Sequence, residues 1–108
     1  IPSYVEHAQY KCYVQIRPQV LSKSWTRDHI INEINQRGVP CFSGSCSEVY
    51  KEKAFTETNF HPKFPLVNAQ KLGENSLMFL VHPSLTEQDL LTTCDGLVSV
   101  FEQINAEH

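Results

Sequence analysis

Leu77–Val81 constrains the fold more than any other stretch, because it is an uninterrupted apolar run with the sequence Leu-Met-Phe-Leu-Val. Apolar side chains at consecutive positions are typical of a strand that is covered on both faces, and such strands lie inside a sheet. Pro83 follows shortly afterwards and cannot donate to a strand ladder. The run therefore predicts a central strand, and other elements must cover both of its faces.

Two shorter stretches are predicted to accompany this central strand. Residues 10–17 alternate between apolar and polar side chains, which indicates a half-buried strand. One face carries Tyr10, Cys12, Val14 and Ile16, and the other carries Lys11, Tyr13, Gln15 and Arg17. A second strand is expected at about Val39–Ser43, ahead of a stretch of small polar residues.

Three helices are predicted between and after these strands. Thr26 can cap the first helix, and Gly38 ends it. Pro65–Leu72 fits a short helix that stops at Gly73. The longest helix begins at a capping box formed by Thr86–Asp89. Its apolar stripe consists of Leu90, Leu91, Cys94, Leu97, Val98, Phe101 and Ile104.

This order of elements predicts one domain over residues 1–108. The expected fold class is an α/β (α+β) two-layer domain with a small mixed or antiparallel sheet of about three strands. The expected core consists of Val14, Ile16, Ile30, Ile34, Leu77, Phe79, Val81, Leu90, Leu97 and Phe101. Because two main helices cover only one face of such a sheet, we expect the long loop 49–65 or another domain to cover the second face. We therefore expect the chain to be a piece of something larger.

The 49–65 loop carries Phe55, Phe60 and Phe64 along an irregular, charged stretch. This pattern fits a surface loop pinned by aromatic anchors, and it fits equally a loop that faces a partner. The residues do not decide between these two interpretations.

Charge and hydropathy exclude two kinds of partner. The formal net charge is −3 and the basic residues are scattered, so no stripe of Lys and Arg could neutralise nucleic-acid phosphates. No apolar run approaches the ~20 residues of a membrane helix. A soluble protein that binds neither nucleic acid nor membrane is therefore expected.

The cysteines fit free thiols in a reducing, cytoplasmic setting better than disulfides. Cys12 and Cys94 lie within apolar patterns and are expected to be buried. Cys41 and Cys46 have a C-x4-C spacing without a second pair of ligands, so no metal site is expected.

The stretch Cys41–Tyr50 gathers more chemically capable side chains than any other part of the chain. Cys46 could act as a nucleophile with His61 or His82 as its base, although such a thiol is more often structural. The serines lack the Gly-x-Ser-x-Gly elbow of a hydrolase, and no glycine-rich phosphate loop is present. The residues alone therefore predict a loop of small residues at a strand end.

Several segments, spread over nearly the whole chain, share the pattern of one protein family. They are His7–Tyr10 with Tyr13–Val14, Trp25–Ile30, Gly38–Tyr50 with Glu52–Phe55, Leu72–Leu77, and His82–Thr86. In this order and spacing they resemble the C-terminal domain of the sugar aminotransferases of the DegT/DnrJ/EryC1/StrS family. The resemblance implies the fold of the small domain of fold-type-I aminotransferases.

The resemblance also implies an activity for the complete enzyme. Such enzymes use pyridoxal phosphate to move an amino group, usually from glutamate, onto a nucleotide-linked keto sugar in the biosynthesis of amino sugars and cell-surface polysaccharides. The Schiff-base lysine and most phosphate contacts belong to a preceding large domain. We therefore expect no catalytic or cofactor-binding residue in this chain, no activity from the chain alone, and a homodimer for the full-length enzyme.

Several relatives carry a His-Tyr pair that touches the sugar nucleotide, and this chain has Gly44-Ser45 at the corresponding positions. The resemblance then implies that Ser43, Gly44, Ser45 and Tyr50 form a substrate-binding wall, in which the hydroxyl groups replace the missing hydrogen bonds. The alternative is that these residues only cap the loop. Two other functions stay open, namely a stand-alone ligand-binding or regulatory domain and a thiol enzyme centred on Cys46.

Overall fold

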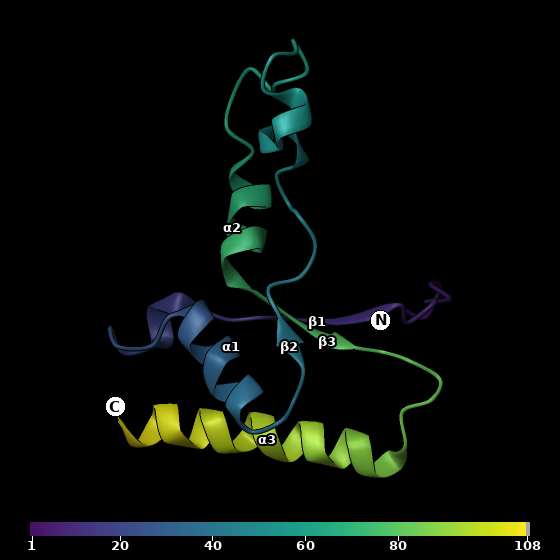
Figure 1. Cartoon of the computed structure of the whole chain (residues 1–108), viewed down its shortest axis with the longest axis vertical. Coiled ribbons are helices and arrows are strands. Elements are labelled where there is room, and N and C mark those ends of the chain that lie inside the picture. Colours follow the sequence, from purple (N-terminus) through teal and green to yellow (C-terminus); the bar gives the residue numbers. More distant parts are fainter. Residues whose placement is uncertain (108) are drawn as a thin grey trace.

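The apolar run forms the central strand of the sheet, as the sequence predicts. The computed structural model describes residues 1–107. The strand Ser76–Leu80 (β3) pairs antiparallel with Lys11–Gln15 (β1) on one side and with Cys41–Phe42 (β2) on the other. Both outer strands are shorter than predicted. The expected fold class is confirmed in its antiparallel form, as a small α+β domain of two layers (Figure 1).

The first and last helices begin where the sequence predicts. Arg27–Gln36 (α1) starts at Thr26, whose Oγ1 accepts a hydrogen bond from the His29 N–H at 3.2 Å. Glu87–Ala106 (α3) starts at the Thr86–Asp89 capping box, with both of its hydrogen bonds present. Each cap satisfies backbone N–H groups that have no partner within the first turn of a helix.

The middle helix differs from the prediction at its end. It spans Val67–Asn75 (α2), so Gly73 lies inside the helix and does not stop it. A Cβ at Gly73 would collide with the Ser47 hydroxyl oxygen. The glycine therefore serves close packing of α2 against the loop that follows β2.

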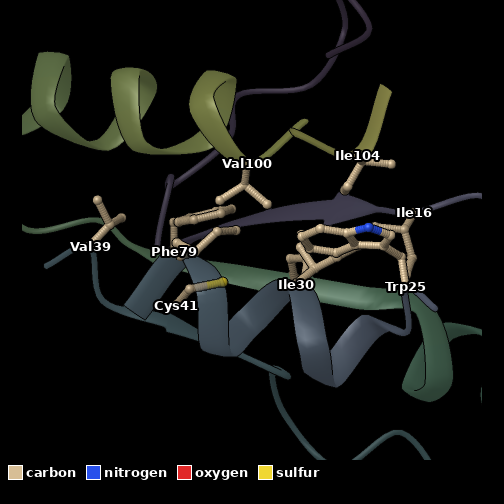
Figure 2. Close-up of a cluster of buried hydrophobic side chains, with 10 residues drawn as sticks. Ile16, Trp25, Ile30, Val39, Cys41, Phe79, Val100 and Ile104 are labelled. Carbon is tan, nitrogen blue, oxygen red and sulfur yellow. The ribbon is translucent and has the colours of Figure 1, made fainter. Parts of the chain in front are cut away.

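α1 and α3 lie on one face of the sheet, and the core fills the space between them and the strands (Figures 1 and 2). Of the predicted core, Ile16, Ile30, Ile34, Leu77 and Phe79 are buried, and Val14, Leu97 and Phe101 are partly buried against them. Trp25, Val39, Cys41, Val100 and Ile104 complete the cluster. Figure 2 shows Val100 and Ile104 of α3 pointing toward Phe79, Ile30 and Trp25.

Four residues that were expected to be buried are exposed. Val81 and Leu90 are 41% and 53% exposed, and Cys12 and Cys94 are also exposed. These predictions were wrong because an open apolar groove of about 500 Å³ separates the first half of α3 from this end of the sheet, and all four residues line it. The helix closes on the sheet only from Gly96 onward, where a Cβ would lie 2.7 Å from Val39 Cγ2.

Among residues 1–107, no helix lies over the second face of the sheet (Figure 1). We call it the outer face; it carries a row formed by Tyr13, Met78 and Phe42, which are opposite one another in the strand register. Met78 is 8% exposed because its neighbours flank it, whereas Tyr13 and Phe42 are 45% and 46% exposed.

The long loop does not cover this outer face. We call residues 43–75 the arm. Its first residues lie against Tyr13 at the edge of the outer face, and the turns Val49–Lys51 (η2) and Lys53–Phe55 (η3) then carry it away from the sheet before α2 leads back to β3 (Figure 1). Phe60 and Phe64 are 77% and 78% exposed, so the interpretation of these two residues as anchors was wrong. None of the helices within residues 1–107 combines the length and hydropathy needed to cross a membrane.

Replacing Phe79 by Ala should lower the free energy of unfolding by about 3–5 kcal/mol, because it removes a buried aromatic ring from the core. Leu80→Ala is the matched control, since Leu80 is the next residue of the same strand and is 49% exposed. We expect the control to cost less than about 1 kcal/mol. Urea unfolding measures both values, and equal losses would contradict the assignment of Phe79 to the core.

Candidate functional site

The loop after β2 begins at a strand that is fixed on both edges. β3 pairs with one edge of β2, and the Asn35 side chain of α1 pairs with the other. Asn35 Nδ2 donates to the Cys41 carbonyl at 3.0 Å, and the Cys41 N–H donates to Asn35 Oδ1 at 2.9 Å. An amide side chain thus takes the place of a further strand and closes an edge that would otherwise expose unpaired groups. This arrangement sets where Ser43 and Gly44 leave the sheet.

The loop then lies over the Tyr13 ring on the outer face. Gly44 has φ +94°, and a Cβ there would lie 2.6 Å from Tyr13 Cε1. Only glycine combines this backbone conformation with so close an approach. The contact brings Ser45 to the Tyr13 hydroxyl, which accepts from the Ser45 N–H at 3.1 Å and donates to Ser45 Oγ at 3.1 Å.

Lys11 completes this contact from the same strand. Its Nζ donates to Ser45 Oγ at 3.2 Å. The hydrogen bonds from Ser45, together with the nearby Lys11 charge, lower the pKa of the Tyr13 phenol. Lys11, Tyr13 and Ser45 therefore form one hydrogen-bonded cluster that ties the loop to β1, and we call it the Ser45 cluster.

Three of the predicted site residues share a cavity. A hollow of about 350 Å³ lies between the loop and α2, and Ser43, Gly44 and Ser45 line it. The other lining residues are Cys46, Ser47, Glu48, Lys51, Glu52, Gln70, Gly73 and Glu74. Hydroxyl, amide and carboxylate groups dominate this wall, so it suits hydrogen bonding to a ligand with many hydroxyl groups.

Tyr50 does not join the other predicted residues. It borders a second hollow of about 350 Å³ together with His61, Phe64 and Gln70. Its hydroxyl donates to Glu48 Oε1 at 2.5 Å, and Lys51 Nζ lies 3.0 Å from the same oxygen. These two partners lower the pKa of Glu48, and the Glu48 carboxylate raises the pKa of Tyr50. Tyr50 thus holds Glu48 in place.

The surroundings of Cys46 disfavour a thiolate. A hydrogen bond to Glu52, partial desolvation and the charges of Glu52 and Glu48 raise the pKa of this thiol. Neither predicted base reaches it: His61 Nε2 lies 2.7 Å from the Phe55 carbonyl, and His82 Nδ1 lies 2.7 Å from Ser84 Oγ. A nucleophilic cysteine needs a lowered pKa or an adjacent base, so the geometry does not favour a thiol enzyme. Residues 1–107 contain no group of His, Cys, Asp and Glu side chains arranged to hold a metal ion.

Lys11 and Tyr13 are the site residues that sequence reasoning missed. Both belong to the polar face of the predicted first strand, for which the sequence analysis named no partner residue. The presence of an aromatic ring among polar residues on that face was a signal for a contact. Its partner could not be identified, because Ser45 is 32 residues away from Tyr13.

The fold is found in a known enzyme. The structure resembles the X-ray structure of the aminotransferase from Psychrobacter cryohalolentis with a TM-score of 0.89 and 54% sequence identity, over 93% of this chain and 25% of that chain. The chain therefore spans about a quarter of the length of that protein and is similar to one domain of it. No protein-family model matches the chain, and no curated protein sequence matches it.

Gly44→Ala should displace the Tyr13 ring and so break its bonds to Ser45. We expect the pKa of Tyr13 to rise toward the ordinary value of a tyrosine, because those bonds are what lower it. Gly38→Ala is the matched control, since Gly38 also has a positive φ but nothing lies within 4 Å of its Cβ position. Both variants should lose roughly 1–2 kcal/mol of stability from backbone strain.

The measurement is an NMR pH titration of ring-labelled tyrosines, in which Tyr13 is resolved from the other rings. An unchanged Tyr13 pKa in Gly44→Ala would show that the loop does not depend on this contact.

Proposed function

We propose that this chain is the C-terminal small domain of a pyridoxal-phosphate-dependent aminotransferase of the DegT/DnrJ/EryC1/StrS type. In this proposal the complete enzyme transfers an amino group to a nucleotide-linked keto sugar, as a cytoplasmic homodimer. The observation that carries it is the 54% identity to an aminotransferase over 93% of this chain. The segment order described above, from His7 to Thr86, supports the finer assignment to sugar aminotransferases.

The exposed apolar surface supports a role as one part of a larger enzyme. The outer face presents Tyr13 and Phe42, and the arm presents Phe60, Phe64 and Val67, all at least 45% exposed. Burial of such exposed apolar side chains against another surface would be favourable. We propose that the remaining part of the enzyme covers the outer face and the arm.

Within that enzyme, the loop from Ser43 to Ser45 forms one wall of the substrate cleft. It lies at the end of β2, where the sheet and Asn35 fix its backbone, and it lines a polar cavity. Fixed strands with variable loops at their ends are where such scaffolds place binding groups. Ser43 and Ser45 bind the substrate through their hydroxyls, Gly44 provides close approach, and Tyr50 positions Glu48.

The chain itself does not fit the cofactor. A Schiff-base lysine needs a desolvated pocket or a neighbouring cation that lowers its pKa. Lys23, Lys51, Lys53, Lys63 and Lys71 are exposed, and Lys11 bonds Ser45. Glu48 raises the pKa of Lys51, which is the opposite of what the reaction needs. We propose that the cofactor is held outside this chain, where it supplies the electron sink for amino transfer.

The isolated chain should therefore be catalytically inert. When it is mixed with pyridoxal phosphate and reduced with borohydride, we expect only diffuse labelling spread over the exposed lysines. Mass spectrometry of the peptides measures the distribution. A stoichiometric adduct on one lysine, with transamination activity, would refute this expectation.

In the complete enzyme, Ser45→Ala should raise KM for the nucleotide sugar about two- to twelve-fold, because it removes one hydrogen bond worth roughly 0.5–1.5 kcal/mol. The half-reaction with glutamate should stay nearly unchanged, since it uses the other domain. Tyr50→Phe should have a smaller effect on KM, because its hydroxyl is engaged by Glu48.

Ser24→Ala serves as the control, since Ser24 is exposed and its hydroxyl pairs with Ser22 Oγ in the connection before α1. Both half-reactions are measured by stopped-flow absorbance of the cofactor. If Ser45→Ala slowed both half-reactions equally, the loop would have a structural role only. Absence of amino transfer to any nucleotide-linked keto sugar would reject the proposed function.

A further inference from the structure

The Ser45 cluster leaves hydrogen-bond donors unused. Ser45 Oγ accepts from Lys11 Nζ at 3.2 Å and from the Tyr13 hydroxyl at 3.1 Å. A serine oxygen has two acceptor positions, and both are taken. When Tyr13 and Lys11 donate to Ser45 Oγ in this way, the Ser45 hydroxyl hydrogen is free to donate to a ligand.

Lys11 also retains donors. One of its three ammonium hydrogens goes to Ser45, and its Nζ lies 5.3 Å from the centre of the Tyr10 ring. Within residues 1–107, no carboxylate lies within ion-pairing distance of this ammonium group. Lys51 gives the contrast, because its Nζ lies 3.0 Å from Glu48 Oε1. The Lys11 side of the loop therefore presents a positive charge that no acidic side chain balances.

The cluster is held in one geometry before any ligand arrives. Gly44 lies against the Tyr13 ring, and the Ser45 N–H donates a hydrogen bond to the Tyr13 hydroxyl. The hydrogen bonds with Ser45 are the main cause of the lowered pKa of the Tyr13 phenol, and the Lys11 charge adds to it. Phosphoryl oxygens bind well where hydrogen-bond donors are already in position beside a positive charge that has no acidic partner.

We propose that Lys11, Tyr13 and Ser45 bind a phosphoryl group, with the Lys11 ammonium and the Ser45 hydroxyl donating to its oxygens and Tyr13 positioning Ser45. The identity of the ligand rests on the proposed function: it is the diphosphate of the nucleotide-linked sugar. On this assignment Ser45 contacts the diphosphate, and the sugar extends toward Ser43 and the cavity beside α2. In that cavity Glu48 is paired with Lys51, whereas Glu52 and Glu74 would repel a phosphate and favour a neutral sugar there.

The test uses the 108-residue chain and inorganic pyrophosphate as the probe, with binding followed by NMR shifts of the Gly44 and Ser45 amides. We expect saturable binding that sodium chloride at equal ionic strength does not reproduce. Lys11→Met should weaken it about ten-fold or more, since a charge-assisted hydrogen bond is lost. Tyr13→Phe keeps the ring under Gly44 and should weaken binding about two- to twelve-fold.

The controls separate this site from general attraction of anions. Lys23→Met removes an exposed charge in the connection between β1 and α1 and should leave binding unchanged, and Lys11→Arg should retain most of it. Binding that is lost equally in Lys11→Met and Lys23→Met would overturn the proposal, as would a native chain that pyrophosphate does not shift more than chloride does.

Two further probes identify the source of the phosphoryl group. The nucleoside diphosphate UDP should bind more tightly than pyridoxine phosphate, a cofactor analogue without the aldehyde. The reverse order would overturn the assignment to the substrate. The proposed function fails separately, because it depends on amino transfer by the complete enzyme and not on pyrophosphate binding by this chain.

Discussion

The burial of β3 between two antiparallel neighbours is the interaction on which the rest of the structure depends. Leu77 is fully buried and Phe79 is 5% exposed, and both pack with Ile30 and Val100 in one cluster. A well-packed core tolerates few voids, so the close packing of these side chains fixes the positions of the strands beside β3. The Tyr13 ring on β1 and the loop after β2 meet because both flanking strands are registered on β3.

The coverage of the sheet on one face only gives the domain its second property. α1 and α3 enclose the core side, while the arm projects from the opposite side and leaves Phe60 and Phe64 exposed (Figure 1). Burial of exposed aromatic rings against another surface is favourable, because it removes apolar area from water. This asymmetry agrees with a similarity that covers only 25% of an aminotransferase. It also favours the proposed enzyme domain over a stand-alone ligand-binding module, because in a stand-alone module the aromatic side chains of the arm would remain in water.

The loop after β2 separates two electrostatic environments. On the strand side, Lys11 has no carboxylate partner among the described residues. On the α2 side, the hydrogen bond with Glu52 and desolvation raise the pKa of the Cys46 thiol and so keep it protonated. A loop with one cationic and one acidic side can discriminate between the charged and the neutral part of one ligand. The same charges explain why a stretch rich in possible nucleophiles does not form a nucleophilic centre.

The sequence by itself determined the order of elements, the central strand and the points at which α1 and α3 begin. These features depend on local hydrogen bonds and on side-chain periodicity, which a short window of residues contains. The tertiary structure alone decided that Leu90 and Cys94 line an open groove, since this depends on how closely α3 approaches Val39 at Gly96. It also decided that Ser45 meets Lys11 and Tyr13 while Tyr50 lies in a different hollow. Such contacts join residues far apart in the chain, and only the packing of the strands brings them together.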